Sequence, residues 1–225
     1  MSKKLIFILN VLLIVIVSIG NLFYQLNDFN FSLKCFCSIC FSLIGIINLA
    51  YAIKLKKNNI MFYIFMAIGL FLAMLGDILL EFDFIIGATT FALGHIGYFI
   101  AYFIYNKSNK LDYIIITCLA LFSVLFIGFF PLLEFDSLLI KIVCIIYAII
   151  ISIMLGKAIA NALIKRNIAT IIIAIASALF FFSDLMLVFN WFMDAGRWSS
   201  NLCMATYYPA NLLLALSMYI NIIKE

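Results

Sequence analysis

The stretch "IATIIIAIASALFFFSDLMLVFNWF" (168–192) contains a single charged residue, Asp184, in an otherwise apolar run. About 20 apolar residues suffice to cross the hydrocarbon core of a membrane as a helix. We therefore interpret 168–192 as a membrane span that holds a carboxyl group within it. The question that follows is whether the rest of the chain is built in the same way.

The composition predicts an integral membrane protein. Of the 225 residues, 68% are hydrophobic and 11% are charged, whereas soluble domains are about 25% charged. The connections are short, so we expect an all-α integral membrane protein with one transmembrane domain, 1–225. Eight transmembrane helices are predicted, over 5–23, 35–53, 61–80, 84–105, 113–130, 138–156, 168–192 and 203–222. The first begins like a signal peptide, but without a clear small-x-small cleavage site we expect a retained helix.

Lysine and arginine predict the orientation. With a cytoplasmic N-terminus, eleven of the fourteen fall in inner segments and three in outer ones. Cytoplasmic segments carry the excess of these residues, so we predict both termini in the cytoplasm. The net charge of +4 is mostly this signal and does not indicate a nucleic-acid partner. The inner set is Lys3, Lys4, Lys54, Lys56, Lys57, Lys107, Lys110, Lys157, Lys165, Arg166 and Lys224; the outer set is Lys34, Lys141 and Arg197.

The cysteines do not predict a metal site. Cys35, Cys37 and Cys40 are close in sequence, but on a helix Cys37 points about 200° away from Cys35. No histidine is near them, and the chain has one histidine in all. We interpret the cysteines as small buried hydrophobic residues and expect neither a metal nor an organic cofactor. The chain also lacks a Gly-x-Ser-x-Gly nucleophile motif and a phosphate-binding P-loop.

A second stretch resembles the first one. "LGDILLEF" (75–82) and "FSDLMLVF" (182–189) each place a Leu three residues and a Phe five residues after the aspartate. Asp77 and Asp184 lie 184 − 77 = 107 residues apart, on spans that run in the same direction, which suggests two four-helix repeats. Each lies sixteen residues past the cytoplasmic start of its span, at Met61 or Ile168. Both are therefore expected at one level, in the outer half of the membrane.

Two carboxyl groups at one depth favour a functional site. A charge inside the membrane is costly and usually faces a cavity or a partner. The structural alternative is that each aspartate caps or bonds a neighbouring helix. If Asp77 and Asp184 share a cavity, one is expected to keep its proton while the other is ionised, as acid–base hydrolysis requires.

Further polar residues fall near the same level. Glu81 lies one turn beyond Asp77, where a solvated interfacial charge is the alternative reading. His95, the single histidine, shares a helix face with Tyr98, and Gly94 and Gly97 permit close helix packing. A satisfied structural histidine is the alternative for His95. In the last span, Pro209 is expected to kink the helix, and the residues expected to line the cavity are Tyr207, Tyr208 and Asn211.

Together these features resemble a known family. "GDILL" and "GHIGY" on spans three and four, "SDLML" on span seven and "YYPAN" on span eight are similar in order and spacing to the YhhN-like lysoplasmalogenase family of polytopic membrane proteins. Family members commonly carry Gln where this chain has Asn211. The resemblance implies hydrolysis of the vinyl ether bond of lysoplasmalogens to a fatty aldehyde and glycerophosphoethanolamine or glycerophosphocholine.

On this reading the two aspartates carry the reaction. A vinyl ether is cleaved through an oxocarbenium ion, as glycosides are by paired carboxyl groups. One of Asp77 and Asp184 is expected to act as the acid and the other as stabiliser and base. His95, Tyr98 and Tyr208 are expected to position water or the headgroup. The partners expected are a lysophospholipid that enters from the outer leaflet and membrane lipid, in the cell membrane of a bacterium.

Two rival functions stay open at this point. Paired intramembrane acids and a repeated fold also suit a small proton-coupled transporter. That function requires polar groups along the whole path, and the cytoplasmic halves of the spans are mostly apolar. A non-catalytic lysolipid-binding protein uses the same cavity without turnover.

Overall fold

The structure, a computed structural model, describes residues 2–27, 30–193 and 195–224, and within them it contains helices and no strand. Seven of the helices, α1 to α7, are long and apolar enough to cross a membrane, which makes the chain a multi-pass membrane protein. The eight helices are α1 (Lys3–Leu26), α2 (Phe31–Lys54), α3 (Ile60–Leu79), α4 (Phe84–Tyr105), α5 (Lys110–Phe129), α6 (Leu138–Lys165), α7 (Ile168–Phe192) and α8 (Arg197–Lys224).

Two buried lysines explain where α2 and α6 extend beyond the predicted spans. We predicted that helices begin at 35 and end at 156, but α2 already includes Lys34 and α6 continues through Lys157. Both side chains are buried, and Lys157 Nζ donates to Asp112 Oδ2 at 2.7 Å and to the Lys107 carbonyl at 3.2 Å. Because an ion pair neutralises each lysine inside the bundle, its charge does not end the helix. Counting Lys34 and Lys157 as loop charges was therefore wrong.

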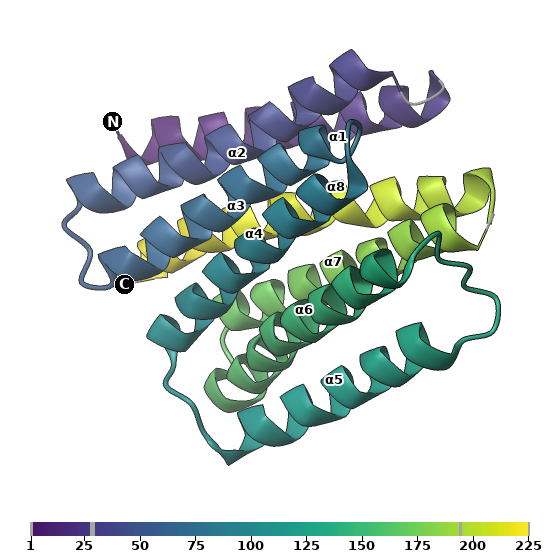
Figure 1. Cartoon of the computed structure of the whole chain (residues 1–225). Helices are drawn as coiled ribbons and strands as arrows, with labels where there is room; N and C mark the ends of the chain where they lie inside the picture. The colour runs from purple at the N-terminus through teal and green to yellow at the C-terminus, as the bar shows by residue number, and fades with distance from the viewer. Residues whose placement is uncertain (1, 28–29, 194, 225) are drawn as a thin grey trace.

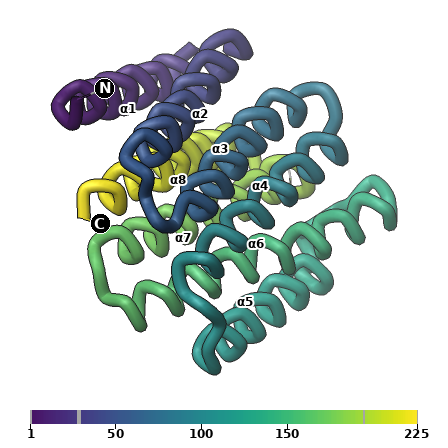
Figure 2. The backbone as a smooth tube through the Cα atoms, turned by 90° about the vertical axis from the view of Figure 1, so that its left-hand side faces the viewer, coloured from purple at the N-terminus to yellow at the C-terminus, as the bar shows by residue number. Residues whose placement is uncertain are grey.

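The helices form a bundle with α8 near its middle. α8 packs against α1, α2, α3 and α7, whereas α5 packs on α6, with Phe126 also in ring contact with Phe189 of α7. α1 and α5 lie at opposite edges of the bundle in both views (Figures 1 and 2). The two termini lie at the same end (Figure 1). That this end is cytoplasmic stays a prediction.

The position of α8 accounts for its polarity. It begins at Arg197 rather than at the predicted 203, it continues as a helix through Pro209, and it is not among the seven strongly apolar helices. Asn211, Ser217 and Asn221 are buried in it. Polar side chains suit a helix that faces other helices, where they find partners, better than one that faces lipid. An eighth membrane span at α8 stays a prediction.

The packing of the helices repeats along the chain. The contacts α1–α2, α2–α3, α3–α4 and α2–α8 recur as α5–α6, α6–α7, α7–α8 and α6–α4. The α3–α8 contact also has a side-chain counterpart in α4–α7, where Tyr102 bonds Ser177 at 3.0 Å and His95 packs on Phe180 at 4.7 Å. This pattern favours the two four-helix repeats that the aspartate motifs suggested.

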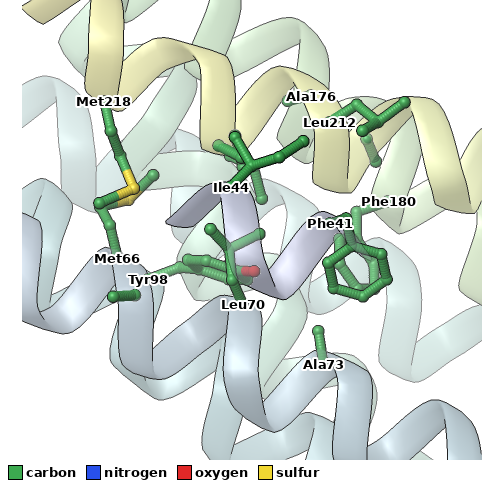
Figure 3. Packing of buried hydrophobic residues seen from close by; sticks show 14 of the residues in the cluster. Phe41, Ile44, Met66, Leu70, Ala73, Tyr98, Ala176, Phe180, Leu212 and Met218 are labelled. Carbon is green, nitrogen blue, oxygen red and sulfur yellow. The ribbon is translucent and has the colours of Figure 1, made fainter. Parts of the chain in front are cut away.

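Close packing of α3 on α4 fixes the position of the histidine-bearing helix. A Cβ atom on Gly94 would lie 3.3 Å from the Gly69 carbonyl oxygen, and one on Gly97 would lie 3.4 Å from the Phe65 carbonyl oxygen. The glycines thus let the two backbones approach, as predicted. Tyr98 packs one turn beyond Gly94 in the core that Figure 3 shows.

Polar caps set the start of the helices that carry His95 and Asp184. The Asp83 side chain accepts a hydrogen bond from the Ile86 N–H at 2.8 Å at the start of α4. Asn167 does the same for the Thr170 N–H at 2.9 Å at the start of α7. Such caps satisfy backbone donors that have no partner within the helix. They fix where along each helix the polar residues fall.

Candidate functional site

Asp184 belongs to a cluster of three side chains from three helices. Tyr147 of α6 donates its hydroxyl hydrogen to Asp184 Oδ2 at 2.5 Å. His95 of α4 places Nε2 2.8 Å from the Tyr147 hydroxyl oxygen and 3.3 Å from Asp184 Oδ2. In the tautomer that carries its hydrogen on Nε2, His95 can donate to either of these oxygens. Asp184 Oδ2 thus accepts from Tyr147 and lies within hydrogen-bond distance of His95.

Two other atoms of this cluster have no hydrogen-bond partner among the described residues. His95 Nδ1 is buried and has no hydrogen-bond partner among the described residues. The polar contacts that Asp184 makes with the described residues involve Oδ2, which leaves Oδ1 for a ligand. Asp184 is 7% exposed, which is enough for one edge of the carboxyl group to reach the cavity beside it.

That cavity is apolar and lies among α4, α5, α6 and α7. It has a volume of about 90 Å³, and both Asp184 and Tyr147 line it. Phe122 of α5 also lines it and is 59% exposed, so the cavity reaches the outer surface of the bundle beside α5. In a membrane-spanning chain this surface faces lipid. The arrangement brings a carboxyl group to the wall of a space suited to a hydrocarbon chain.

Asp77 belongs to a different cluster, which contains a cation. Lys34 Nζ lies 3.3 Å from Asp77 Oδ1 and 2.5 Å from Glu81 Oε1. Ser38 donates to Asp77 Oδ2 at 2.5 Å and Tyr208 donates to the same oxygen at 3.4 Å. Asp77 is 2% exposed. Both of its oxygens are therefore occupied by partners from α2 and α8.

A second cavity adjoins the Asp77 cluster. It has a volume of about 330 Å³ and a mixed lining that includes Lys34, Glu81, Asn190 and Trp191. Leu187 lines this cavity and the apolar one. The two cavities therefore adjoin at Leu187, one turn beyond Asp184 on α7.

The two aspartates do not form the pair that the sequence suggested. Each has its own partners, and neither cavity is lined by both. Aromatic rings connect the clusters: Tyr207 packs on Tyr208 at 5.1 Å and on Phe180 at 5.4 Å, and Phe180 packs on His95 at 4.7 Å. The expectation of two carboxyl groups face to face across one pocket is therefore wrong. The physical reason is that each finds stronger partners on a neighbouring helix.

The remaining predicted residues divide between the clusters and the core. Glu81 and Tyr208 belong with Asp77, and His95 belongs with Asp184. Tyr207 donates to the Ala73 carbonyl at 2.9 Å, and Tyr98 donates to Asn211 Oδ1 at 3.5 Å. In these contacts Tyr98, Tyr207 and Asn211 join α3, α4 and α8. None of the three lines either cavity.

Sequence reasoning missed three residues of the clusters. Lys34 and Ser38 were not connected with Asp77, although they lie one turn apart near the start of α2. Tyr147 was missed in the middle of "CIIYAII" (144–150). A tyrosine hydroxyl deep in an apolar span needs a hydrogen-bond partner, and this was the signal available in the sequence.

Comparison with known proteins assigns the family. The model of the YhhN family matches residues 7–218, which is nearly the whole chain. No curated protein and no solved structure matches. The chain therefore belongs to the YhhN family, as the motifs on spans three, four, seven and eight indicated.

Proposed function

We propose that this YhhN-family protein is a membrane-embedded hydrolase that cleaves the vinyl ether bond of a lysoplasmalogen. Its products are a fatty aldehyde and glycerophosphoethanolamine or glycerophosphocholine. The observation that carries the proposal is the carboxyl group of Asp184, bonded to Tyr147 and His95, at the wall of an apolar cavity. Family membership supports the reaction class.

The reaction needs one proton delivered and one returned. Protonation of the β-carbon of the vinyl ether breaks the carbon–carbon π bond and leaves an oxocarbenium ion. Water adds to that cation and gives up a proton, which forms a hemiacetal. The hemiacetal then breaks its bond to the glycerol oxygen, which takes up the hydroxyl proton, to release the alcohol and the aldehyde. The summed change is the addition of one water molecule.

A single carboxyl group can serve both proton transfers in turn. In its acid form Asp184 donates from Oδ1 to the alkene carbon, and the resulting carboxylate keeps its two hydrogen bonds at Oδ2. The carboxylate lies beside the cation it has created and stabilises it, as in glycoside hydrolysis. It then accepts the proton of the attacking water and is restored. Tyr147 and His95 stabilise the charged form between the two steps.

Asp77 has a different part in this proposal. Its separate partners remove the geometric support for a mechanism in which the two aspartates act as one pair. Asp77 instead holds Lys34 within the bundle, and Lys34 in turn holds Glu81. We assign proton transfer to Asp184 alone.

The test measures aldehyde released from lysoplasmenylethanolamine by the protein purified in detergent. The proposal expects release by the wild-type protein and a loss of about 10²–10⁴-fold in Asp184→Asn, the range of general acid–base catalysis. Asp136→Asn is the matched control because Asp136 is exposed at the same end of the bundle. Absence of aldehyde from wild-type protein that binds the lipid would overturn the proposal. Proton-driven flux of a solute into proteoliposomes without product would instead favour the transporter.

A further inference from the structure

We propose that the second cavity binds the ammonium group of a lysolipid headgroup, with Glu81 as its anionic contact and Trp191 as its aromatic wall. The inference deepens the proposed function, because it places the polar end of the same substrate. Two observations support it. One ammonium group, that of Lys34, lies between two carboxyl groups, and the second cavity adjoins the one at Asp184.

The charges around the cavity favour a cation. Lys34 is one ammonium group between two carboxyl groups, with its Nζ 3.3 Å from Asp77 and 2.5 Å from Glu81. Its positive charge is therefore already matched, and a phosphate group gains little from it. Glu81 has a side chain that is 43% exposed and lines the cavity. A second ammonium group restores the balance of two carboxylates with two cations.

Aromatic groups in the cavity wall suit the same ligand. Trp191 and Tyr24 line the cavity together with Glu81. The face of an indole ring attracts an ammonium ion, and quaternary ammonium ligands are commonly held by aromatic walls. A carboxylate and an indole around one space therefore match ethanolamine or choline better than they match a neutral or purely anionic headgroup.

The relation of the two cavities fits one lipid molecule. Leu187 lines both cavities, and Trp191 in the second packs against Phe84 of the first with ring centroids 5.2 Å apart. From Asp184 to Trp191 is seven residues along α7, or about 10 Å at 1.5 Å per residue. The glycerophosphate of a lysolipid separates its ether bond from its amine by a comparable length. With the ether bond at Asp184, the amine reaches Glu81 and Trp191.

The test is a binding measurement that needs no turnover. Radiolabelled lysophosphatidylethanolamine, which has an ester in place of the vinyl ether, is titrated onto the purified protein and compared with lysophosphatidylglycerol of the same chain length. The wild-type protein is expected to bind the amine lipid more tightly. Glu81→Gln is expected to weaken that binding about tenfold, the size of one charge-assisted contact, and to leave lysophosphatidylglycerol unchanged. Glu134→Gln, an exposed glutamate at the same end of the bundle, is the matched control and should change neither.

A second variant keeps the inference testable if Glu81→Gln does not fold. Trp191→Leu is expected to weaken binding of the amine lipid several-fold with no effect on lysophosphatidylglycerol. Equal affinity of the wild-type protein for the two lipids, or equal losses for both lipids in Glu81→Gln and Trp191→Leu, would overturn the inference. Because the probe lipid lacks the vinyl ether, this result is separate from the aldehyde assay. Amine selectivity without aldehyde release contradicts the hydrolase alone, and aldehyde release without amine selectivity contradicts the headgroup site alone.

Discussion

Asp77 and Asp184 occupy equivalent positions in the two halves of the chain, yet their surroundings differ. The helix contacts of one half recur in the other, and a lysine stands at the same spacing in both: 141 − 34 is 107, as is 184 − 77. Lys34 turns inward to Asp77. Lys141 instead donates to the Gly128 carbonyl at 3.0 Å, at the end of α5. Asp77 thus has a lysine beside it, whereas Asp184 has Tyr147 and His95.

The difference shows how one helix position serves two purposes. A carboxylate paired with a buried lysine has its charge matched and its oxygens occupied, so it contributes to the position of the helices. Near Asp184, the C-terminal end of α5 draws the equivalent lysine away, since backbone carbonyls there attract cations. Asp184 keeps Tyr147 and His95 as its polar neighbours and an open side toward the cavity. This is the environment in which the proposed function places proton transfer.

The sharpest test of this comparison exchanges each aspartate for asparagine. Asp184→Asn is expected to lose aldehyde formation by about 10²–10⁴-fold, because Asn cannot transfer the proton. Asp77→Asn keeps one oxygen that can accept from Ser38 and Tyr208, although it loses the ion pair with Lys34, and kcat is expected to stay within about tenfold of wild type. The measurement is kcat for both variants on one lysoplasmalogen, with thermal unfolding in detergent to confirm that each is folded. Equal losses in the two variants would restore the two-carboxylate mechanism.

Removing the cation from the first cluster is expected to affect stability. Lys34→Met leaves Asp77 buried without its cation and should lower the free energy of unfolding by about 3–5 kcal/mol, the usual cost of breaking a buried ion pair. The double variant Lys34→Met/Asp77→Asn should recover most of that loss, because the only charge left without a partner is that of Glu81, whose side chain is 43% exposed. The equivalent Lys141→Met is expected to cost about 1 kcal/mol, since it loses one hydrogen bond. Unfolding in detergent measures all three, and failure of the double variant to recover would contradict the pairing.

How much of the fold and of the site the sequence could predict depends on how far apart along the chain the contacting residues lie. The apolar runs predicted the helices, and α4 and α7 begin and end as predicted. The position of each aspartate along its helix was also predictable, because it needs only the rise per residue. Which way Asp77 and Asp184 point did not follow, because the rotation of each helix depends on its neighbours. Lys34 was read as a loop charge, so the partner that decides the environment of Asp77 was not considered.

The smallest of these effects comes from the tyrosine hydroxyl next to each aspartate. Tyr147→Phe removes the hydroxyl that donates to Asp184 at 2.5 Å, and a hydrogen bond to a charged group contributes about 1.5–3 kcal/mol. We therefore expect kcat to fall by about ten- to a hundredfold with KM little changed, since the ring stays in the cavity wall. Tyr208→Phe removes the corresponding hydroxyl from Asp77, at 3.4 Å, and is expected to change kcat less than about twofold. If both phenylalanine variants lowered kcat alike, proton transfer would not be confined to the Asp184 side, and the difference between the two halves would lie in packing rather than in chemistry.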